Sequence, residues 1–375
     1  MKQRIYADNA ATTKLDSAAF DEMRPYLLEY YGNPSQPYGF AKEPQKALKS
    51  ARERIARCIN ADPEEIFFTS CGTESDNWVI KGVAYNRGKD YVTITSEIEH
   101  HAVLNSVASI ERIGYPVGYL HPNCFGVISP SELSRIITDA TGLVSVMLAN
   151  NEIGTIQPIK ELAKIAHAHG AFFHTDAVQA VGHIEIDVKD LGIDFLSASA
   201  HKFNGPKGCG FLYIKRGTPI QALLDGGAQE KERRAGTENV ASIVGMAKAL
   251  EVNCGDLENN TTHLRNLEKA LLAQLTSSGI AFQRNGCEPR VPGNISLSFT
   301  SIDGEALLHR LDLRGICVST GSACDSVKTQ VSHVLKAIRL EEKWARGTIR
   351  VSLGKYNTVE EAAIIGEEII KIVKG

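Results

Sequence analysis

The sequence has no Cys-x-x-Cys pair among its eight cysteines, and no apolar run of the ~18 residues that a membrane helix needs. The first absence argues against a zinc or iron–sulfur site built from clustered ligands, so no metal is expected. The second, with an N-terminus that lacks the apolar run of a signal peptide, predicts a cytoplasmic protein without membrane contact. In that compartment the cysteines should be small buried residues rather than disulfides, and one of them is a candidate nucleophile.

An excess of charge of either sign is missing as well. The 375 residues carry 41 Lys and Arg against 44 Asp and Glu, a formal net charge of −3. This balance gives no support for nucleic-acid binding or for a basic surface that faces a membrane. With 43% hydrophobic residues and no long linker or repeat, the chain is long enough for a large core and for two domains.

Apolar runs alternate with helix-like segments in the first two thirds of the chain. We expect strands at 65–69, 91–95, 142–149, 171–175 and 210–214, and helices at 73–87, 99–113 and 159–169. This alternation predicts an α/β fold with a mostly parallel sheet covered by helices. Beyond Cys254 the pattern changes to a helix at 263–277, an alternating and therefore half-exposed strand at 291–299, and a helix at 358–374. This part predicts a smaller α+β domain.

Lys202 is the most unusual residue of the first part, because it follows the apolar run 193–196 among small residues. Buried lysines are rare, since loss of water disfavours the ammonium form. One interpretation is a loop lysine with its stem on apolar surface and its amine in water. The other is a nucleophile that forms an imine with a carbonyl compound. The stretch alone leaves both open.

Other polar residues lie at strand ends, where parallel sheets bind ligands. Gly72 and Thr73 begin a helix whose N-terminus could bind a phosphate, or Thr73 is an ordinary cap. Asp176 ends a buried strand and needs a partner such as a protonated ring nitrogen, or it forms a local turn. His100 could stack on a planar ring or cap a helix, and Asn151 could bond a ring hydroxyl or form a turn.

Ser199 and His201 precede Lys202 and could donate to the same phosphate, or simply be satisfied polar groups at a strand end. With Gln179, the set supplies an imine lysine, an aspartate for a ring nitrogen, a stacking aromatic residue and a phosphate site. One cofactor needs all four. The sequence therefore predicts pyridoxal 5'-phosphate.

Longer motifs then match one family over essentially the whole chain. They are YADNAATT (6–13), YGNPS (31–35), TES (73–75), EH (99–100), NNEIG (150–154), DAVQ (176–179), SAHK (199–202), GPKG (205–208), RRAGTEN (233–239), GSAC (321–324) and IRVS (349–352). With them the chain resembles the cysteine desulfurases of the nitrogen-fixation and iron–sulfur-assembly type. These belong to the class V aminotransferase group of fold-type I pyridoxal-phosphate enzymes.

The resemblance implies roles for the cofactor residues. Lys202 would hold the cofactor covalently and move the substrate Cα proton, and His100 would stack on the ring and assist. Asp176 would keep the ring nitrogen protonated, while Gln179 and Asn151 would bond the ring oxygen region. The phosphate would be bound by Gly72, Thr73, Ser199, His201 and, from the neighbouring subunit, Thr237. That last assignment implies a homodimer with active sites at the interface.

The resemblance also implies a substrate and a reaction. Arg350 would bind the carboxylate of L-cysteine with its forked guanidinium, assisted by Asn151 and Asn33. Cys324, in a small polar loop, would attack the substrate sulfur as a thiolate. The products would be L-alanine and a persulfide on Cys324 that passes to an acceptor protein. Candidate acceptors are an iron–sulfur scaffold, a transfer-RNA thiolation enzyme, a thiamine-pathway carrier and a DNA-modification partner. The large domain would span 14–254, and 1–13 with 255–375 would form the small domain.

Two alternatives remain open in the sequence. One is another class V enzyme, an aminotransferase or a selenocysteine lyase, and the other is a non-catalytic sulfur carrier with the same fold. Three segments also depart from the family pattern. Cys71 replaces a small residue in the phosphate turn, and segments 226–232 and 327–333 lack the usual GGGQERG and EPS sequences. These departures make the local loops and the choice of acceptor harder to predict.

Overall fold

The computed structural model describes residues 4–320 and 331–375. Its larger part is built on a seven-stranded sheet of order β2-β8-β7-β6-β5-β3-β4. The strands are β2 (Ile66–Thr69), β3 (Val92–Ser96), β4 (Val117–Leu120), β5 (Thr141–Ser145), β6 (Phe172–Asp176), β7 (Phe195–Ser199) and β8 (Gly210–Ile214). Only β8 runs antiparallel to its neighbours β2 and β7, while the other pairs are parallel. The predicted mostly parallel sheet is confirmed.

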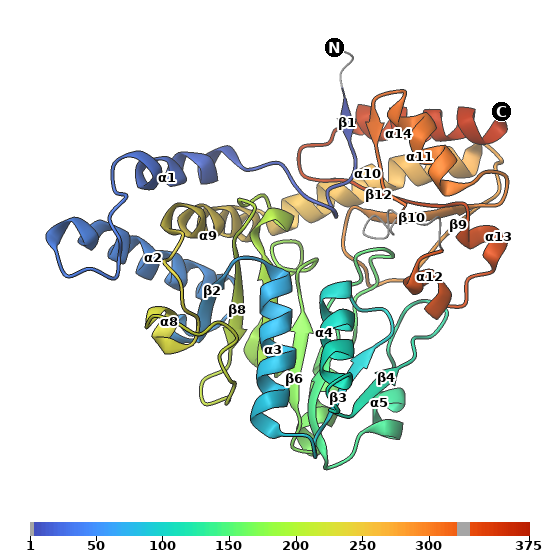
Figure 1. The fold of residues 1–375 in the computed structure, drawn as a ribbon. Helices are drawn as coiled ribbons and strands as arrows, with labels where there is room; N and C mark the ends of the chain where they lie inside the picture. Colours follow the sequence, from blue (N-terminus) through green and yellow to red (C-terminus); the bar gives the residue numbers. More distant parts are fainter. Residues whose placement is uncertain (1–3, 321–330) are drawn as a thin grey trace.

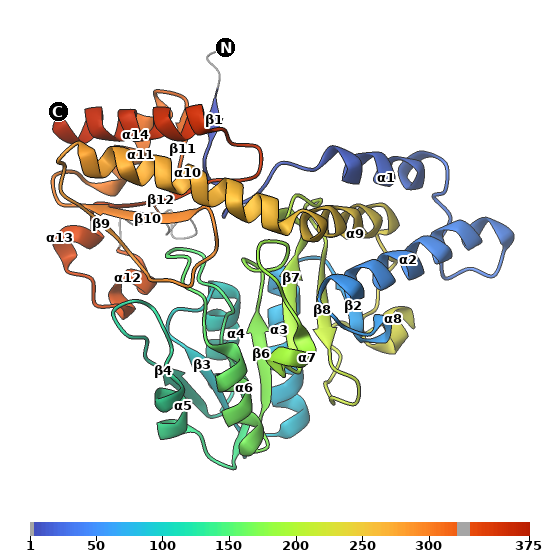
Figure 2. The ribbon, with the colours of Figure 1, turned by 180° about the vertical axis from the view of Figure 1, so that it is seen from behind.

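Helices cover both faces of this sheet. Figure 1 shows α3 (Gly72–Arg87) and α4 (His101–Glu111) in front of it, and Figure 2 shows α6 (Ile159–Ala168) and α7 (Val188–Leu191) on the opposite face. Accordingly β5, β6, β7 and β8 are buried along nearly their whole length, as strands between two helical layers must be. The remaining short elements of this part are α5 (Pro130–Ile136), η2 (Pro63–Glu65) and η3 (Ala200–Lys202).

Two helices from the N-terminal part pack together on one later helix. α1 (Ser17–Leu28) and α2 (Lys42–Cys58) contact α9 (Val240–Gly255), and they extend to one side of the molecule (Figure 1). The short helix η1 (Gly39–Ala41) directly precedes α2 and contacts it. The short helix α8 (Gln229–Glu232) contacts η2, where Lys231 Nζ donates to Glu64 O at 3.0 Å. Residues 17–58 are called the N-terminal arm below; they pack on a helix that lies about 200 residues later in the chain.

The smaller part is built on a second, antiparallel sheet of order β12-β10-β9. Its strands are β9 (Phe282–Arg284), β10 (Asn294–Phe299) and β12 (Thr348–Ser352), and the parallel pair β1 (Ile5–Tyr6) and β11 (Ile316–Cys317) lies beside them. Its helices are α10 (Leu257–Ser277), α11 (Gly304–Asp312), α12 (His333–Ala337), α13 (Glu342–Ala345) and α14 (Val359–Lys374). One core cluster unites Ile5 and Ala7 with residues 264–372. The domain limits, 14–254 for the large domain and 1–13 with 255–375 for the small one, stay predictions. α12 lies within the predicted small domain, yet its Val334 and Leu335 pack into the core of the larger part.

Two expectations about strands are wrong. The strand expected at 142–149 ends at Ser145. β10 is buried on both faces, although its alternating sequence is typical of a half-exposed strand. The reason is a buried polar layer: Asn285 Nδ2 donates to Ser296 Oγ at 3.1 Å and to Ser298 Oγ at 2.8 Å. An alternation of apolar and polar residues therefore predicts that one face of the strand is polar, but it does not predict that this face is exposed to solvent.

The cysteines are also less buried than expected. Of those in the described ranges, Cys209 is buried, Cys124 is exposed, and the others are half-buried. Several lie at the ends of elements, such as Cys58 at the end of α2 and Cys254 near the end of α9. Within residues 4–320 and 331–375, no helix combines the length and the apolar character needed to cross a membrane.

Candidate active site

A cavity of about 170 Å³ lies where the central strands end. Nine of the predicted cofactor residues line it: Gly72, Thr73, His100, Asn151, Asp176, Gln179, Ser199, His201 and Lys202. They come from the ends of β6 and β7 and from the segments that follow β2, β3, β5, β6 and β7. Because these five strands point the same way in the sheet, their carboxyl ends meet at one edge.

One end of the cavity is suited to a phosphate group. α3 begins at Gly72, and its N-cap residue Cys71 is extended and provides no side-chain cap. A Cβ at Gly72 would approach Val178 Cγ2 to 2.5 Å, so only glycine permits this close packing. Ser199 Oγ is buried without a hydrogen-bond partner among the described residues. An uncapped helix N-terminus beside an unpaired hydroxyl is a favourable environment for an anion.

Asp176 provides a buried carboxylate at the end of β6. Its Oδ1 accepts a hydrogen bond from the backbone N–H of Val178 at 2.9 Å. Burial raises the pKa of Asp176 to about 6, although the Val178 hydrogen bond and the charge of Lys202 act in the opposite direction. A buried carboxylate of this kind is stabilised by a cationic partner, and a protonated pyridine nitrogen has the required charge.

His100 lines the cavity and also caps α4, so the capping interpretation is confirmed, while its role toward a planar ring stays a prediction. Its Nδ1 accepts from the backbone N–H of Ala102 at 3.1 Å, which leaves the ring proton on Nε2. Burial, together with the charge of Lys202, lowers the pKa of His100 to about 4. The imidazole is therefore neutral near pH 7. His201 is similar: burial first, then Lys202, lowers its pKa to about 4.

Lys202 points its amine at backbone oxygen atoms of the N-terminal segment. It lies in η3, directly after β7, and Nζ donates to Ala10 O at 2.6 Å and to Ala11 O at 2.8 Å. Gln179 Nε2 donates to the same Ala10 oxygen at 3.0 Å. The amine thus lies in the cavity with Asp176 rather than in open solvent. Its chemistry remains a prediction.

Sequence reasoning missed two buried acids beside the cavity. Asp76 is 1% exposed and lines the cavity, and burial, with the charge of Asp176, raises its pKa well above the ordinary value. Glu99 accepts from Ser96 Oγ and from Met147 N, and burial raises its pKa to about 8. Asp76 could have been found from its spacing, because it follows Thr73 by three residues on α3 and so faces the same side of the helix.

Arg350 lies in β12, just outside the lining of the cavity. Its Nη1 donates to Asn151 O at 2.9 Å, and its Nη2 donates to Asp8 Oδ1 at 2.8 Å. Because Asn151 lines the cavity, this contact places the guanidinium next to it.

The other predicted residues are not brought to the cavity. Thr237 is exposed and lines a separate cavity of about 130 Å³. Asn33 lies on the N-terminal arm, where its Oδ1 accepts from Ser35 N at 2.9 Å. Cys324 lies outside the described residues.

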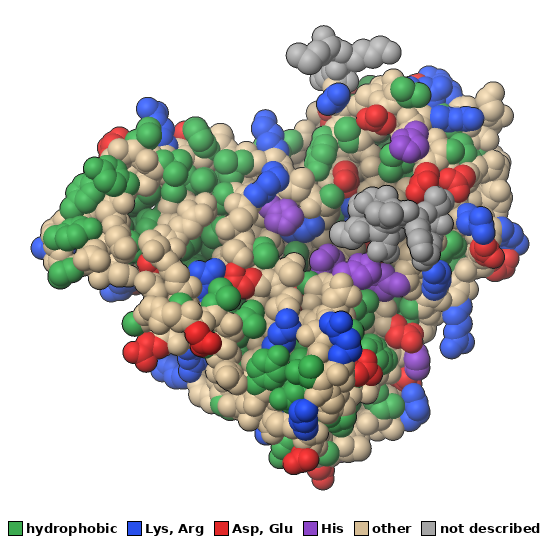
Figure 3. All heavy atoms as spheres, in the orientation of Figure 1, with side chains coloured by type: hydrophobic (Ala, Val, Ile, Leu, Met, Phe, Trp, Pro, Cys, Tyr) green, Lys and Arg blue, Asp and Glu red, His purple; other side chains and the backbone are tan. Residues whose placement is uncertain are grey.

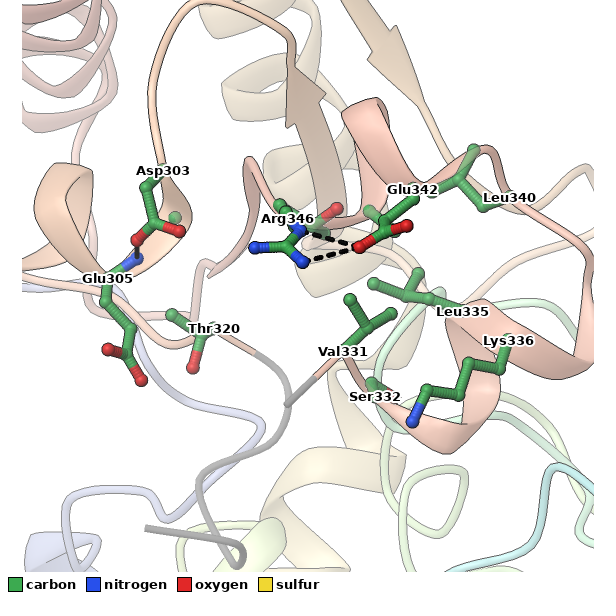
Figure 4. Close-up of a pocket in the computed structure, with 13 residues that line it drawn as sticks. Asp303, Glu305, Thr320, Val331, Ser332, Leu335, Lys336, Leu340, Glu342 and Arg346 are labelled. Atoms are coloured by element: carbon green, nitrogen blue, oxygen red, sulfur yellow. Dashed lines mark hydrogen bonds and ion pairs between the residues drawn. The ribbon is translucent and has the colours of Figure 1, made fainter. Parts of the chain in front are cut away.

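A larger cavity of about 500 Å³ lies beside the two ends of segment 321–330. Thr320 and Val331, which flank that segment, both line it, as Figure 4 shows. Arg346 and Glu342 form an ion pair across one side of it. Ser332, also in the lining, donates to Glu152 Oε2 at 2.6 Å and so connects this region to the turn after Asn151.

Comparison with known proteins identifies relatives over the full length. The family described as aminotransferase class-V matches residues 5–365. "Cysteine desulfurase IscS" of Clostridium botulinum (strain Hall) is 47% identical, covering 100% of this chain and 95% of that protein. The protein of the same name from Methanosarcina thermophila is 47% identical over 99% of this chain and 92% of its own.

Solved structures agree with these relatives. A "NIFS-LIKE PROTEIN" has a TM-score of 0.93 at 39% identity and covers 99% of this chain and 100% of its own. "SspA in complex with cysteine" has a TM-score of 0.84 at 35% identity, with 95% and 100% covered. The predicted α/β fold of the fold-type I enzymes is thereby confirmed.

Proposed function

Because the chain belongs to the class V aminotransferase family and, within it, to the cysteine desulfurases, we propose that it converts L-cysteine to L-alanine. Enzymes of this family depend on pyridoxal phosphate, and the sulfur would leave as a persulfide on Cys324. The observation that carries the proposal is the single cavity that holds Lys202, Asp176 and the uncapped N-terminus of α3. The cysteine bound to the related SspA supports the choice of substrate.

The residues present fit the cofactor. Pyridoxal phosphate supplies an electron-poor ring that takes up the negative charge formed at the substrate Cα. Asp176 would hold a proton on the ring nitrogen, and Gln179 and Asn151 would bond the ring oxygen region. Thr73, Ser199 and His201 would bind the phosphate together with the backbone at Gly72. The unpaired Ser199 Oγ and the tight Gly72 contact favour this assignment.

Lys202 would act first as the amine that binds the cofactor and then as a base. Two backbone oxygens, of Ala10 and Ala11, now hold Nζ. Once released, the amine would take the proton from the substrate Cα. His100 is neutral, because its pKa is lowered to about 4, so its Nε2–H can donate without adding a positive charge beside Lys202.

Arg350 would bind the substrate carboxylate, with Asn151 and Asn33 as further candidates. The Cys324 thiolate would then attack the substrate sulfur. As the S–S bond forms, the substrate Cβ–S bond would break and leave its electron pair on Cβ, which takes up a proton to become the methyl group of alanine, and the persulfide sulfur would pass to an acceptor. An iron–sulfur scaffold or a thiolation enzyme is the proposed acceptor. Assays that follow labelled sulfur from Cys324 to purified acceptors of both kinds would distinguish them.

We also propose a homodimer, because the N-terminal arm exposes large apolar side chains. They include Phe20 (50% exposed), Leu28 (65%) and Tyr31 (72%), and Figure 3 shows hydrophobic side chains gathered over α1 and the adjoining end of the arm. Patches of this kind usually mark protein interfaces. A second copy would bring in Thr237, which does not line the cavity of its own chain.

We propose a cytoplasmic location because of the state of the cysteines. All those in the described part of the chain are free thiols, which suits a reducing compartment. Fractionation of native cells, followed by detection of the protein, tests this location.

Two substitutions test the proposed reaction. Lys202→Ala should still bind the cofactor but release no alanine from cysteine. Cys324→Ser should also stop desulfuration, while the cofactor spectrum still responds to cysteine. Persistent alanine formation in Cys324→Ser would instead support an aminotransferase or lyase without an enzyme persulfide. A wild-type protein that remains colourless after incubation with pyridoxal phosphate would favour the non-catalytic carrier.

A further inference from the structure

We propose that Asp8 is a positioning residue for the substrate carboxylate, which it orients through Arg350. Asp8 Oδ1 accepts a hydrogen bond from Arg350 Nη2 at 2.8 Å, although the two residues are 342 positions apart in the chain. The inference rests on the proposed function, in which Arg350 binds the carboxylate of cysteine. It adds a residue whose side chain contacts the arginine and not the cofactor cavity.

The backbone fixes Asp8 opposite Arg350. The segment at Asp8 runs parallel to β12, with Asp8 bridged to Ser352. Ser352 N donates to Ala7 O at 2.8 Å, and Asn9 N donates to Ser352 O at 3.0 Å. Side chains two residues apart on a strand share a face, so Arg350 lies on the same face as Ser352. Asp8, paired with Ser352, therefore presents its carboxylate to the guanidinium.

The guanidinium is held on two sides and keeps further donors. Nη1 bonds to Asn151 O and Nη2 to Asp8, while Nε is buried without a hydrogen-bond partner within the described ranges. Arginine carries several N–H donors in a rigid fork, which matches a carboxylate with two parallel hydrogen bonds. A buried, unpaired N–H is rare in proteins, and a substrate carboxylate would satisfy it.

Asp8 both neutralises the charge of Arg350 and fixes the orientation of its side chain. The Arg350 side chain is only 5% exposed, and a buried cation without a partner is strongly disfavoured. Asp8 neutralises it before substrate binds, and one fixed hydrogen bond selects a single orientation of a long, flexible side chain. Pre-orientation of this kind raises affinity because less freedom is lost on binding.

The same short segment also contacts Lys202. Ala10 O and Ala11 O accept hydrogen bonds from Nζ, two and three residues after Asp8. Residues 8–11 thus bring the proposed carboxylate-binding group and the proposed base into fixed relation to one another. A change at Asp8 should therefore act on carboxylate binding, whereas a general disturbance of the segment should act on both.

The test measures ligand binding by the cofactor-loaded protein, from the change in the visible absorption of the cofactor. L-Alanine serves as the carboxylate-bearing ligand, and ethylamine is the same amine without the carboxylate. Asp8→Ala should weaken L-alanine binding about 10-fold and leave ethylamine binding unchanged, because a charge-assisted hydrogen bond orients only the carboxylate contact. Asp8→Asn keeps an oxygen acceptor for Nη2 and should restore most of the affinity.

Asn9→Ala is the matched control. Asn9 lies in the same segment, but its Nδ2 donates to Ser352 O at 2.9 Å and not to Arg350. It should affect both ligands equally or neither. With cysteine, Asp8→Ala should raise KM far more than it lowers kcat.

Three outcomes would overturn the positioning role. In the first, Asp8→Ala weakens L-alanine and ethylamine equally. In the second, Asn9→Ala reproduces the selective loss. In the third, Arg350→Ala abolishes L-alanine selectivity while Asp8→Ala does not change it. If Arg350→Ala itself leaves L-alanine binding intact, the carboxylate assignment in the proposed function is wrong as well.

Discussion

His100 accepts a hydrogen bond at Nδ1 from the backbone N–H of Ala102, so one side chain both caps α4 and lines the cavity. The cap fixes the tautomer with the proton on Nε2. Burial and the nearby Lys202 keep the ring neutral, with its pKa lowered to about 4. Two properties of the residue, helix capping and ring chemistry, can therefore be separated by substitution.

His100→Asn should keep the cap and lose the ring, because an asparagine side chain also accepts the N–H of the first turn. His100→Ala should lose both. We expect both variants to form alanine from cysteine about 100-fold more slowly, as loss of a proton-transfer group usually does. Only His100→Ala should also lose about 1 kcal/mol of unfolding free energy in urea. A wild-type rate in His100→Asn would mean that the ring takes no part in the reaction.

Gly72→Ala should weaken cofactor binding on the order of 10-fold, because the added Cβ would approach Val178 Cγ2 to 2.5 Å and push the start of α3 away from the phosphate site. The dissociation constant of pyridoxal phosphate can be measured by absorption during dialysis. Gly39→Ala is the control, since a Cβ at Gly39 meets nothing within 4 Å. Adding Val178→Ala to Gly72→Ala should restore affinity. Failure of this rescue would show that the contact with Val178 is not the cause.

Glu232→Gly should stabilise the protein relative to Glu232→Ala. Glu230, Lys231 and Glu232 all have positive φ, with Glu232 at 63°, in the segment that departs from the family sequence. Any side chain with a Cβ is strained there, and glycine is not. We expect a gain of about 1 kcal/mol for glycine over alanine in urea unfolding. In a regular helix the order would be reversed, so higher stability of the alanine variant would contradict the positive φ.

Much of the cavity could be predicted because its residues follow local rules. Asp176, Ser199 and Lys202 lie at or just after strand ends, and parallel strands bring such residues to one edge. The pairing of Asp8 with Arg350 could not be predicted in this way, because no periodicity links residues at opposite ends of the chain. The predicted role of Thr237 needs a second copy of the chain, which one sequence cannot place.

The errors share a physical origin. The alternation in β10 correctly marked Ser296 and Ser298 as a polar face, but Asn285 rather than water satisfies it. Glu99 was noted only as the neighbour of His100. Its burial depends on three segments that meet in space: its own turn, Ser96 at the end of β3, and Met147 beyond β5. Local patterns predict which groups are polar, whereas tertiary packing decides what surrounds them.

Glu99→Gln should change how stability depends on pH. Burial raises the pKa of Glu99 to about 8 in the folded protein, against an ordinary value of 4.5. Between these values the folded protein keeps a proton that the unfolded chain has lost. Unfolding then releases a proton, so Glu99 makes the wild-type protein lose stability as pH rises from about 5 to about 8. Glutamine keeps the Oε1 acceptor for Ser96 and Met147 but does not titrate.

Thermal unfolding of both proteins at about pH 5 and about pH 8 measures the effect, because shared contributions from the other titrating groups cancel in the difference. Relative to wild type, Glu99→Gln should be more stable at the higher pH than at the lower one. Glu305→Gln, which changes an exposed acid on α11, should show no such gain. If Glu99→Gln and wild type change in parallel across this range, Glu99 is already ionised in the folded protein. Its burial would then be offset by interactions stronger than its hydrogen bonds to Ser96 and Met147.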